Sequence, residues 1–360
     1  MHLRRLFAPF VCGALLIALL TPAGAAPISV AAKPKRTATP VAPTPTPTPA
    51  PTPTPAFDPA TVAPSFARGM LAKRPYAVMI DNHPGAYPQT GLDHALVVFE
   101  ALAEFGITRF MAVYVPGTGP DALAIGPVRS ARLYYVQWAM GFGSMYAHAG
   151  GSPQGLALAQ STDKIVNLDA LHRGGGAYFG RSKKRFAPHN LFTSSADLAN
   201  AAAKLKVADF DQPDVGFLFK ADAPEAERPA AQSLSYFFLY KQDNAGWIYD
   251  PATNSYLRLR RGKPARDAAS GEQLRTRNVV VIEVKERKIA GDKKGRIEQD
   301  VVGAGAAKLF QDGKVLDITW QKDSSDAPLR FLTADGQEVQ FNAGQIWIVA
   351  LPAIGNLSIK

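Results

Sequence analysis

The sequence of 360 residues is 47% hydrophobic, 19% charged and 9% aromatic. This composition supports one or two globular domains and excludes a chain that is disordered throughout, a collagen, a coiled coil and a multi-span membrane protein. The net charge of +10 falls to +5 after residue 56, because five basic residues and no acidic ones precede Phe57. Such a mild charge suits an anionic wall polymer or a membrane surface, and no motif indicates a nucleic-acid partner.

The first 26 residues have the features of a secretory signal. A basic start at Arg4 and Arg5 precedes an apolar stretch, and small residues follow at 23–25. An uncleaved anchor is the alternative, although the apolar stretch is shorter than the ~20 residues that span a bilayer. The sole cysteine, Cys12, lies inside the apolar stretch. We therefore expect export to the cell envelope without a lipid, and no disulfide, cysteine-based zinc site or cysteine nucleophile in the mature protein.

Residues 27–69 form a Pro/Thr-rich stalk and linker. A Thr-Pro alternation runs to Pro55 and cannot bury apolar area, so it favours an extended polyproline II conformation. At ~3.1 Å per residue, some 20 residues reach about 60 Å. A ligand for a signalling domain is the alternative interpretation, but strict repetition favours a spacer.

The sequence predicts an α+β fold, with an N-terminal α/β layered domain (70–211) followed by a C-terminal antiparallel β domain (233–360). Strand-like and helix-like patterns alternate in the first domain. Strands are expected at 76–80, 108–115 and 144–147 and helices at 131–141, from Ser152 onward and at 195–206, while 95–105 could be either. No metal or cofactor motif is present: the chain lacks a P-loop, a dinucleotide fingerprint, a GxSxG elbow and an HExxH helix.

The second domain consists of strand-like segments only. They are expected at 236–240, 247–249, 255–260, 278–284, 307–310, 315–320, 329–332, 338–341 and 345–351. Asp312-Gly313 and Asp335-Gly336 separate alternating apolar segments, which is the strongest short signal for a hairpin. The junction, 212–232, resembles neither the stalk nor a Gly/Ser linker, so we expect a substantial interface between the domains.

Polar residues of the first domain gather in loops after predicted strands, where open α/β sheets place their ligands. Asp81 and His83 follow the first strand, and Asp81 could bind a cation, orient a base or cap a turn. His148 ends another strand before two glycines, and Ser152 opens a helix. His148 is either a general base beside a ligand or a structural histidine.

Two arginines, Arg129 and Arg132, stand at the predicted helix start, where free backbone N–H groups favour anions. The alternative is a pair of surface ion pairs. His189 and Asn190 follow a segment, 181–185, with four cations, which is either a lid over an anion or a solvated loop. We predict that Arg129, Arg132 and His148 line one anion-binding pocket.

Glu100 lies in a very apolar segment, where an unpaired carboxylate would be costly. Arg109 is its expected partner. Glu104 is spaced from Glu100 to share one face if this segment is helical.

Several ungapped segments of the sequence resemble the YerB-like family of exported bacterial proteins. That family is mostly lipid-anchored in the envelope and has two domains of unknown function, so the resemblance implies location and architecture and leaves the reaction open. The matching segments are RPYAVMIDNHPGAYPQTGL (74–92), FEALAEFGITRFMAVY (99–114), IGPVRSAR (125–132), YAHAGGSPQ (146–154), APHNLFTS (187–194), NSYLRLRRGKP (254–264), SGEQLRTRNVVV (270–281) and AGQIWIVALP (343–352).

Three positions depart from the family pattern. The anchoring cysteine is missing, Leu96 stands where relatives commonly have Asp, and Ala265 stands where they commonly have His. The order of IGPVRSAR and YAHAGG is also similar to the LytR-CpsA-Psr phosphotransferases. By that likeness Arg109, Arg129 and Arg132 would hold a pyrophosphate, whereas the acidic metal ligand would fall near Leu96, which cannot serve.

Together these features predict a secreted or envelope-tethered protein that binds an anionic cell-wall or glycan ligand, such as peptidoglycan or a wall polymer, through its N-terminal domain. The alternative is an enzyme that acts on a phosphorylated or peptidoglycan-related substrate. The oligomeric state and the choice between these two functions stay open at this point. Candidate ligand-binding residues are Asp81, His83, Glu100, Arg109, Arg129, Arg132, His148, Ser152, His189 and Asn190.

Overall fold

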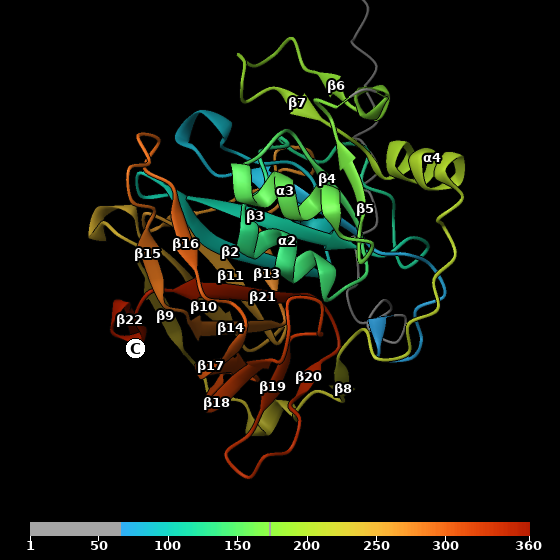
Figure 1. Ribbon diagram of the computed structural model, residues 1–360. Helices are drawn as coiled ribbons and strands as arrows, with labels where there is room; N and C mark the ends of the chain where they lie inside the picture. The colour runs from blue at the N-terminus through green and yellow to red at the C-terminus, as the bar shows by residue number, and fades with distance from the viewer. Residues whose placement is uncertain (1–65, 173) are drawn as a thin grey trace, which may run out of the picture. The chain divides into compact units, whose positions relative to one another are not determined.

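The computed structural model describes residues 66–172 and 174–360, all of which belong to one compact unit (Figure 1). The predicted signal and nearly all of the predicted stalk lie outside these residues. Within them, no helix combines the length and the apolar character needed to cross a bilayer. The described residues are mostly sheet with three α-helices, α2 to α4, which fits the predicted α+β class.

A ten-stranded sheet takes strands from both halves of the chain. Its N-terminal part orders β2, β3, β1, β4 and β5, and its C-terminal part orders β19, β18, β17, β14 and β21. Strand β21 pairs in parallel with β14 on one side and with β2 on the other. The predicted interface between the halves is therefore a continuous set of backbone hydrogen bonds. The bounds are β1 Tyr76–Asp81, β2 Val97–Glu104, β3 Ile107–Tyr114, β4 Met145–His148, β5 Val166–Asp169, β14 Asn278–Glu283, β17 Gly303–Gln311, β18 Lys314–Lys322, β19 Arg330–Leu332 and β21 Ile346–Leu351.

The central strands are apolar on both faces because both faces are covered. In β1 (YAVMID), Ala77 and Met79 enter a core with helix residues, whereas Val78 and Ile80 enter a second core with residues such as Trp247. β21 (IWIVAL) divides its side chains between the same two cores. Such strands appear as continuous apolar runs in the sequence, since neither face meets water.

A second sheet packs against the core that contains Trp247 (Figure 1). Its strands are β12 Lys263–Pro264, β11 Ser255–Arg260, β10 Ala245–Asp250, β9 Ser233–Tyr236 and β22 Leu357–Ile359, with β13 Arg275–Thr276 beside β11. Two-stranded pairs complete the fold: β6 Gly180–Arg181 with β7 Leu191–Phe192, β8 Leu218–Lys220 with β20 Gln340–Asn342, and β15 Glu286–Lys288 with β16 Ile297–Gln299.

The three helices are α2 Leu133–Met140, α3 Pro153–Ser161 and α4 Ser195–Leu205. Ser152 caps α3 by accepting from the Gly155 N–H at 3.2 Å, as its position before Pro153 predicts. Ser194 rather than Ser195 caps α4. Arg132 is the N-cap residue of α2 and Arg129 lies before it, so the prediction that both arginines occupy the first helical turn is wrong.

The strand predictions are largely confirmed, one open choice is decided and one prediction needs correction. The ambiguous segment 95–105 is strand β2, so Glu100 and Glu104 share a strand and no helix. In the second half, β17 and β18 form an antiparallel hairpin, and Asp312 and Gly313 form its predicted turn with φ of 52° and 70°. The prediction of a wholly antiparallel second half is wrong, because β14 and β21 run parallel. Parallel pairing brings together strands far apart in sequence, which local patterns cannot show.

The loop of residues 266–271 docks on the N-terminal half. Asp267 Oδ2 accepts the Leu92 N–H at 3.1 Å, and Ser270 Oγ donates to Asp93 Oδ2 at 2.7 Å. Burial, reinforced by the negative charge of Asp93, raises the pKa of Asp267 from its ordinary 3.8 to about 6. The folded state therefore binds a proton on Asp267 more tightly than the unfolded chain does.

This raised pKa predicts how stability depends on pH at the docked loop. The stabilisation from protonated Asp267 is complete below its ordinary pKa and is lost as the pH rises through about 6. As the pH rises from about 4.5 to 7.5, the parent should lose about 1–2 kcal/mol of unfolding free energy through Asp267. The variant Asp267→Asn has no titratable group at this position and should not show this loss. Urea denaturation at both pH values measures the difference. Parallel pH dependences in the two proteins would contradict the assignment.

Candidate functional site

Asp81, the last residue of β1, gathers three of the residues that the sequence singles out. Its carboxylate is almost fully buried. Oδ1 accepts the backbone N–H of His83 at 3.1 Å, while Oδ2 lies 2.6 Å from His189 Nδ1 and 3.0 Å from Arg129 Nε. Of the roles open to Asp81 in the sequence, the structure supports two: Oδ1 caps the turn at His83 and Oδ2 orients His189.

The rings of His83 and His189 stack, with centroids 4.5 Å apart and planes within 8°. The Gly85 N–H donates to His83 Nδ1 at 3.0 Å, so the proton of neutral His83 lies on Nε2. Burial lowers the pKa of His83, and its electrostatic interactions with His189, Arg129 and Arg260 lower it further against the effect of Asp81. His83 is therefore a neutral hydrogen-bond donor at neutral pH.

Arg260, the last residue of β11, is a functional candidate that the sequence reasoning missed. Its guanidinium lies 4.6 Å from the centroid of the Tyr87 ring, and it has no hydrogen-bond or ion-pair partner among the described residues. Burial lowers its pKa, as does the charge of Arg261. The motif NSYLRLRRGKP contains Arg260, but alternation favours arginines on the solvated face of a strand, so no signal in the sequence singled it out.

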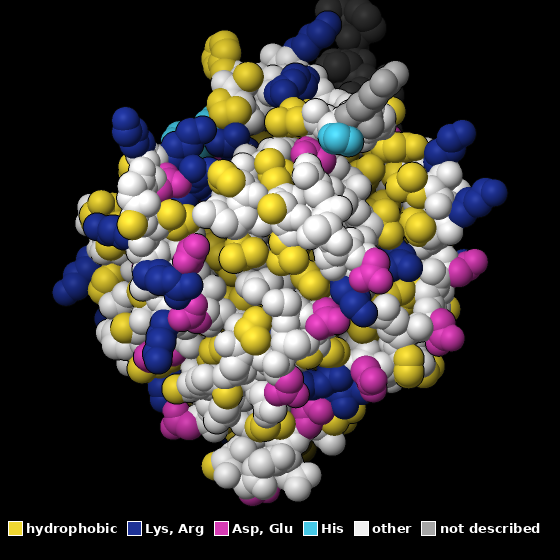
Figure 2. Space-filling model, in the orientation of Figure 1, with side chains coloured by type: hydrophobic (Ala, Val, Ile, Leu, Met, Phe, Trp, Pro, Cys, Tyr) yellow, Lys and Arg dark blue, Asp and Glu magenta, His cyan; other side chains and the backbone are white. Residues whose placement is uncertain are grey.

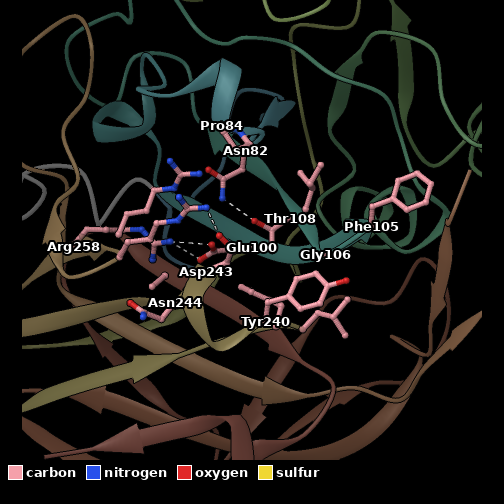
Figure 3. Close-up of a pocket in the computed structure, with 16 residues that line it drawn as sticks. Asn82, Pro84, Glu100, Phe105, Gly106, Thr108, Tyr240, Asp243, Asn244 and Arg258 are labelled. Atoms are coloured by element: carbon pink, nitrogen blue, oxygen red, sulfur yellow. Dashed lines mark hydrogen bonds and ion pairs between the residues drawn. The ribbon is translucent and has the colours of Figure 1, made fainter. Parts of the chain in front are cut away.

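Arg260 lines a cavity of about 120 Å³ between the two halves of the described chain (Figure 3). Asn82, Pro84 and Thr108 contribute from the N-terminal half, and Asn82 Nδ2 donates to Thr108 Oγ1 at 2.7 Å. Tyr240, Asp243, Arg258 and Arg261 contribute from the C-terminal half. Asn82 and Pro84 flank His83 in the sequence, so the cavity adjoins the stacked histidines.

At the base of this cavity, Glu100 forms a buried ion pair with Arg258. Arg258 NH2 donates to both carboxylate oxygens at 2.9 and 2.8 Å, and the Tyr236 hydroxyl donates to Oε2 at 2.9 Å. The Arg258 guanidinium lies 4.4 Å from the centroid of one tryptophan ring, Trp347, and 4.9 Å from that of Trp247. The prediction that Arg109 pairs with Glu100 is therefore wrong.

Arg109 and Arg132 instead donate to the two carboxylate oxygens of Glu104. Arg109 also donates to the Ser130 carbonyl at 3.0 Å, and Arg132 to the Ala131 carbonyl at 2.7 Å. Burial lowers the pKa of Arg109, and the charge of Arg132 adds to that effect. Both arginines therefore have structural roles.

The predicted grouping of Arg129, Arg132 and His148 in one anion pocket is not what the structure shows. His148 is fully buried, with Nδ1 2.8 Å from the Gly150 carbonyl and Nε2 2.7 Å from Asn167 Oδ1. Its two ring nitrogens are thus occupied by the protein. Ser152 caps a helix, and Asn190 Oδ1 accepts from Arg181 at 2.7 Å, so both side chains bind other parts of the protein.

The described part of the chain offers no group of three or more His, Cys, Asp or Glu side chains placed to hold a metal ion. The cluster of Asp81, His83, Arg129, His189 and Arg260, called the His–Arg cluster below, has instead two guanidinium groups for one carboxylate. Figure 2 shows Lys and Arg side chains gathered beside a histidine at the upper left of one face. This composition favours an anionic ligand.

Comparison with known proteins bears on this arrangement. The family described as "Protein of unknown function (DUF3048) N-terminal domain" matches residues 61–208, and the corresponding C-terminal domain matches 235–348. YerB of Bacillus subtilis (strain 168), provisionally named as a lipoprotein, is 34% identical over 296 residues, which cover 80% of this chain and 84% of YerB. The chain belongs to the YerB-like family.

The crystal structure of Bacillus subtilis YerB matches the fold with a TM-score of 0.70 at 30% identity and covers 80% of this chain and 94% of that chain. The resemblance seen in the sequence motifs is thus confirmed, as is the presence of two family domains. The His–Arg cluster takes Asp81, Arg129 and His189 from the first matched segment and Arg260 from the second. In this member of the YerB-like family the candidate site depends on both domains.

The buried pair at the base of the cavity predicts a large loss of stability when one partner is neutralised. Glu100→Gln leaves the Arg258 charge buried without a counter-charge, which should lower the unfolding free energy by about 3–5 kcal/mol. The control is Glu298→Gln, which removes one partner of the exposed Arg287 and should cost about 0–1 kcal/mol. Urea denaturation measures both variants. Equal, small losses would show that the Glu100 pair does not hold the halves together.

Proposed function

We propose that this exported, envelope-associated protein binds an anionic group of a cell-wall polymer or glycan in the His–Arg cluster. The observation that carries the proposal is Arg260, a half-buried guanidinium without a partner among the described residues, at a cavity beside His83. A guanidinium removed from water needs an acceptor. A phosphate or carboxylate oxygen supplies one, and the guanidinium fork suits either group.

Arg129 adds a second cation to the same place. Its Nε lies 3.0 Å from Asp81, and its terminal nitrogens have no hydrogen-bond acceptor in the described chain. These nitrogens are free to contact a ligand oxygen while Asp81 holds the side chain in position. His83, neutral and protonated on Nε2, contributes an uncharged donor.

The location supports a wall component as the source of the anion. The sequence predicts export and a Thr-Pro spacer, and the relative YerB is provisionally named as a lipoprotein. Cell-wall polymers carry phosphate or carboxylate groups at regular intervals, so one anion pocket at the end of a spacer can hold such a polymer. Peptidoglycan and anionic wall polymers are accordingly the first ligands to test by pull-down.

The second candidate function, an enzyme acting on a phosphorylated substrate, is favoured by one specific observation. The Asp81–His189 contact at 2.6 Å is the arrangement that prepares a histidine to accept a proton.

Binding of a simple anion tests the proposed function. Inorganic pyrophosphate titrated calorimetrically into the parent should bind, and Arg260→Ala or Arg129→Ala should weaken it by about tenfold or more, because charge-assisted hydrogen bonds contribute ~1.5–3 kcal/mol. Arg287→Ala, an exposed arginine paired with Glu298 and Asp300, is the matched control and should bind as the parent does. Parent-like affinity in both cluster variants would refute the proposal.

A further inference from the structure

We infer that the His–Arg cluster hydrolyses a phosphoanhydride bond, with His189 as the general base. This inference rests on the proposed function, because it requires the anion to bind there first. It assigns the cluster a reaction and a substrate class: a diphosphate that joins two organic groups.

The position of His189 is the first argument. The Asp81 carboxylate accepts the His83 N–H and pairs with Arg129, so His189 Nδ1 is the donor to it at 2.6 Å, which leaves Nε2 as the ring nitrogen open to act as an acceptor. Nε2 has no partner among the described residues, and the side chain is 17% exposed. Asp81 is itself fixed by the His83 N–H and by Arg129. A base must be oriented, reachable and unoccupied, and His189 meets all three conditions.

His148 provides the contrast within the same chain. It also lies near an aspartate, with Nδ1 3.9 Å from Asp169, but the ring has no exposed surface and the protein occupies both nitrogens. A structural histidine in this fold therefore differs from His189 in the two properties that a base requires.

The second argument concerns the leaving group. The carboxylates of the cluster and the adjoining cavity are Asp81, Glu100 and Asp243, and each is paired with an arginine: Arg129, Arg258 and Arg261 respectively. His83 is neutral, and a neutral imidazole donates a hydrogen bond without giving up its proton. The carboxylates and histidines of the cluster and cavity thus provide a base but no acid for the leaving oxygen, and the hydroxyl of Tyr240 in the cavity is too weak an acid to supply a proton readily.

A substrate for such a site must release a group that leaves without a proton. A phosphate monoester can depart as such a leaving group, because its second pKa is about 6. A sugar or alkyl alkoxide cannot, because it needs a proton as it leaves. Among anionic esters this favours a phosphoanhydride over an alkyl phosphodiester. The two guanidinium groups match the charge of a diphosphate.

The step balances with water as the only co-reactant. A water O–H bond breaks and its proton passes to His189 Nε2, while the water oxygen forms a bond to one phosphorus. The bridging P–O bond breaks and its electron pair stays on the departing phosphate. Arg129 and Arg260 neutralise the developing charge, and His83 Nε2–H donates to a non-bridging oxygen. His189 then releases its proton to solvent, so one diphosphate and one water yield two phosphate monoesters and a proton.

The test uses the full chain and three probes: UDP-glucose as a phosphoanhydride, bis(4-nitrophenyl) phosphate as a diester with an acidic leaving group, and glycerophosphocholine as an alkyl diester. We expect hydrolysis of the first two, followed by phosphorus NMR and by nitrophenolate absorbance, and none of the third. His189→Asn keeps a donor toward Asp81 and should hydrolyse about 100-fold more slowly or worse, while binding pyrophosphate within about threefold of the parent. Added imidazole should restore part of the activity of His189→Ala.

The outcomes separate this inference from the proposed function. If the parent binds pyrophosphate but hydrolyses every probe no faster than His189→Asn, the inference is overturned and anion binding stands. If the parent binds no pyrophosphate, both fail. Cleavage of glycerophosphocholine at the rate of UDP-glucose would overturn the leaving-group argument, and loss of pyrophosphate binding in His189→Asn would reduce His189 to a binding residue.

Discussion

The buried pair of Glu100 and Arg258 is the interaction on which the candidate site depends. Glu100 belongs to β2 of the first family domain and Arg258 to β11 of the second, and tryptophans 247 and 347 lie against the guanidinium. Side chains two residues apart in a strand point to the same face. Holding Arg258 on Glu100 therefore also directs Arg260, two residues further along β11, toward the cavity and the stacked histidines.

The distribution of carboxylates explains why a positive site remains at the surface. Glu104 pairs with two buried arginines, Arg109 and Arg132, and Glu100 pairs with Arg258. Asp81 is shared between His189 and Arg129. Arg260 is left without a carboxylate among the described residues, next to a cavity that contacts solvent. The internal ion pairs thus serve the fold, whereas Arg260 holds its charge where a ligand can reach it.

Local features of the sequence were sufficient to predict much of this arrangement. Alternation predicted β11 at its observed bounds, Asp312-Gly313 marked the turn between β17 and β18, and Ser152 before Pro153 marked a helix start. Polar residues after β1 led to Asp81 and His83. The partner of Glu100 could not be predicted, because Arg258 lies 158 positions away on β11 of the second sheet, and only the packing of the two sheets around the core that contains Trp247 brings them together. The sequence around His148 and His189 does not tell which of the two is structural. The difference lies in their burial, which the structure shows.

The most direct test of the account is nitrogen-15 NMR of the histidine rings, recorded as pyrophosphate is added. The structure predicts that His189 carries its proton on Nδ1 and His83 on Nε2, that both rings shift when pyrophosphate binds, and that His148 does not move. Shifts confined to His148, or no shift at His83 and His189 under saturating pyrophosphate, would contradict the placement of the site.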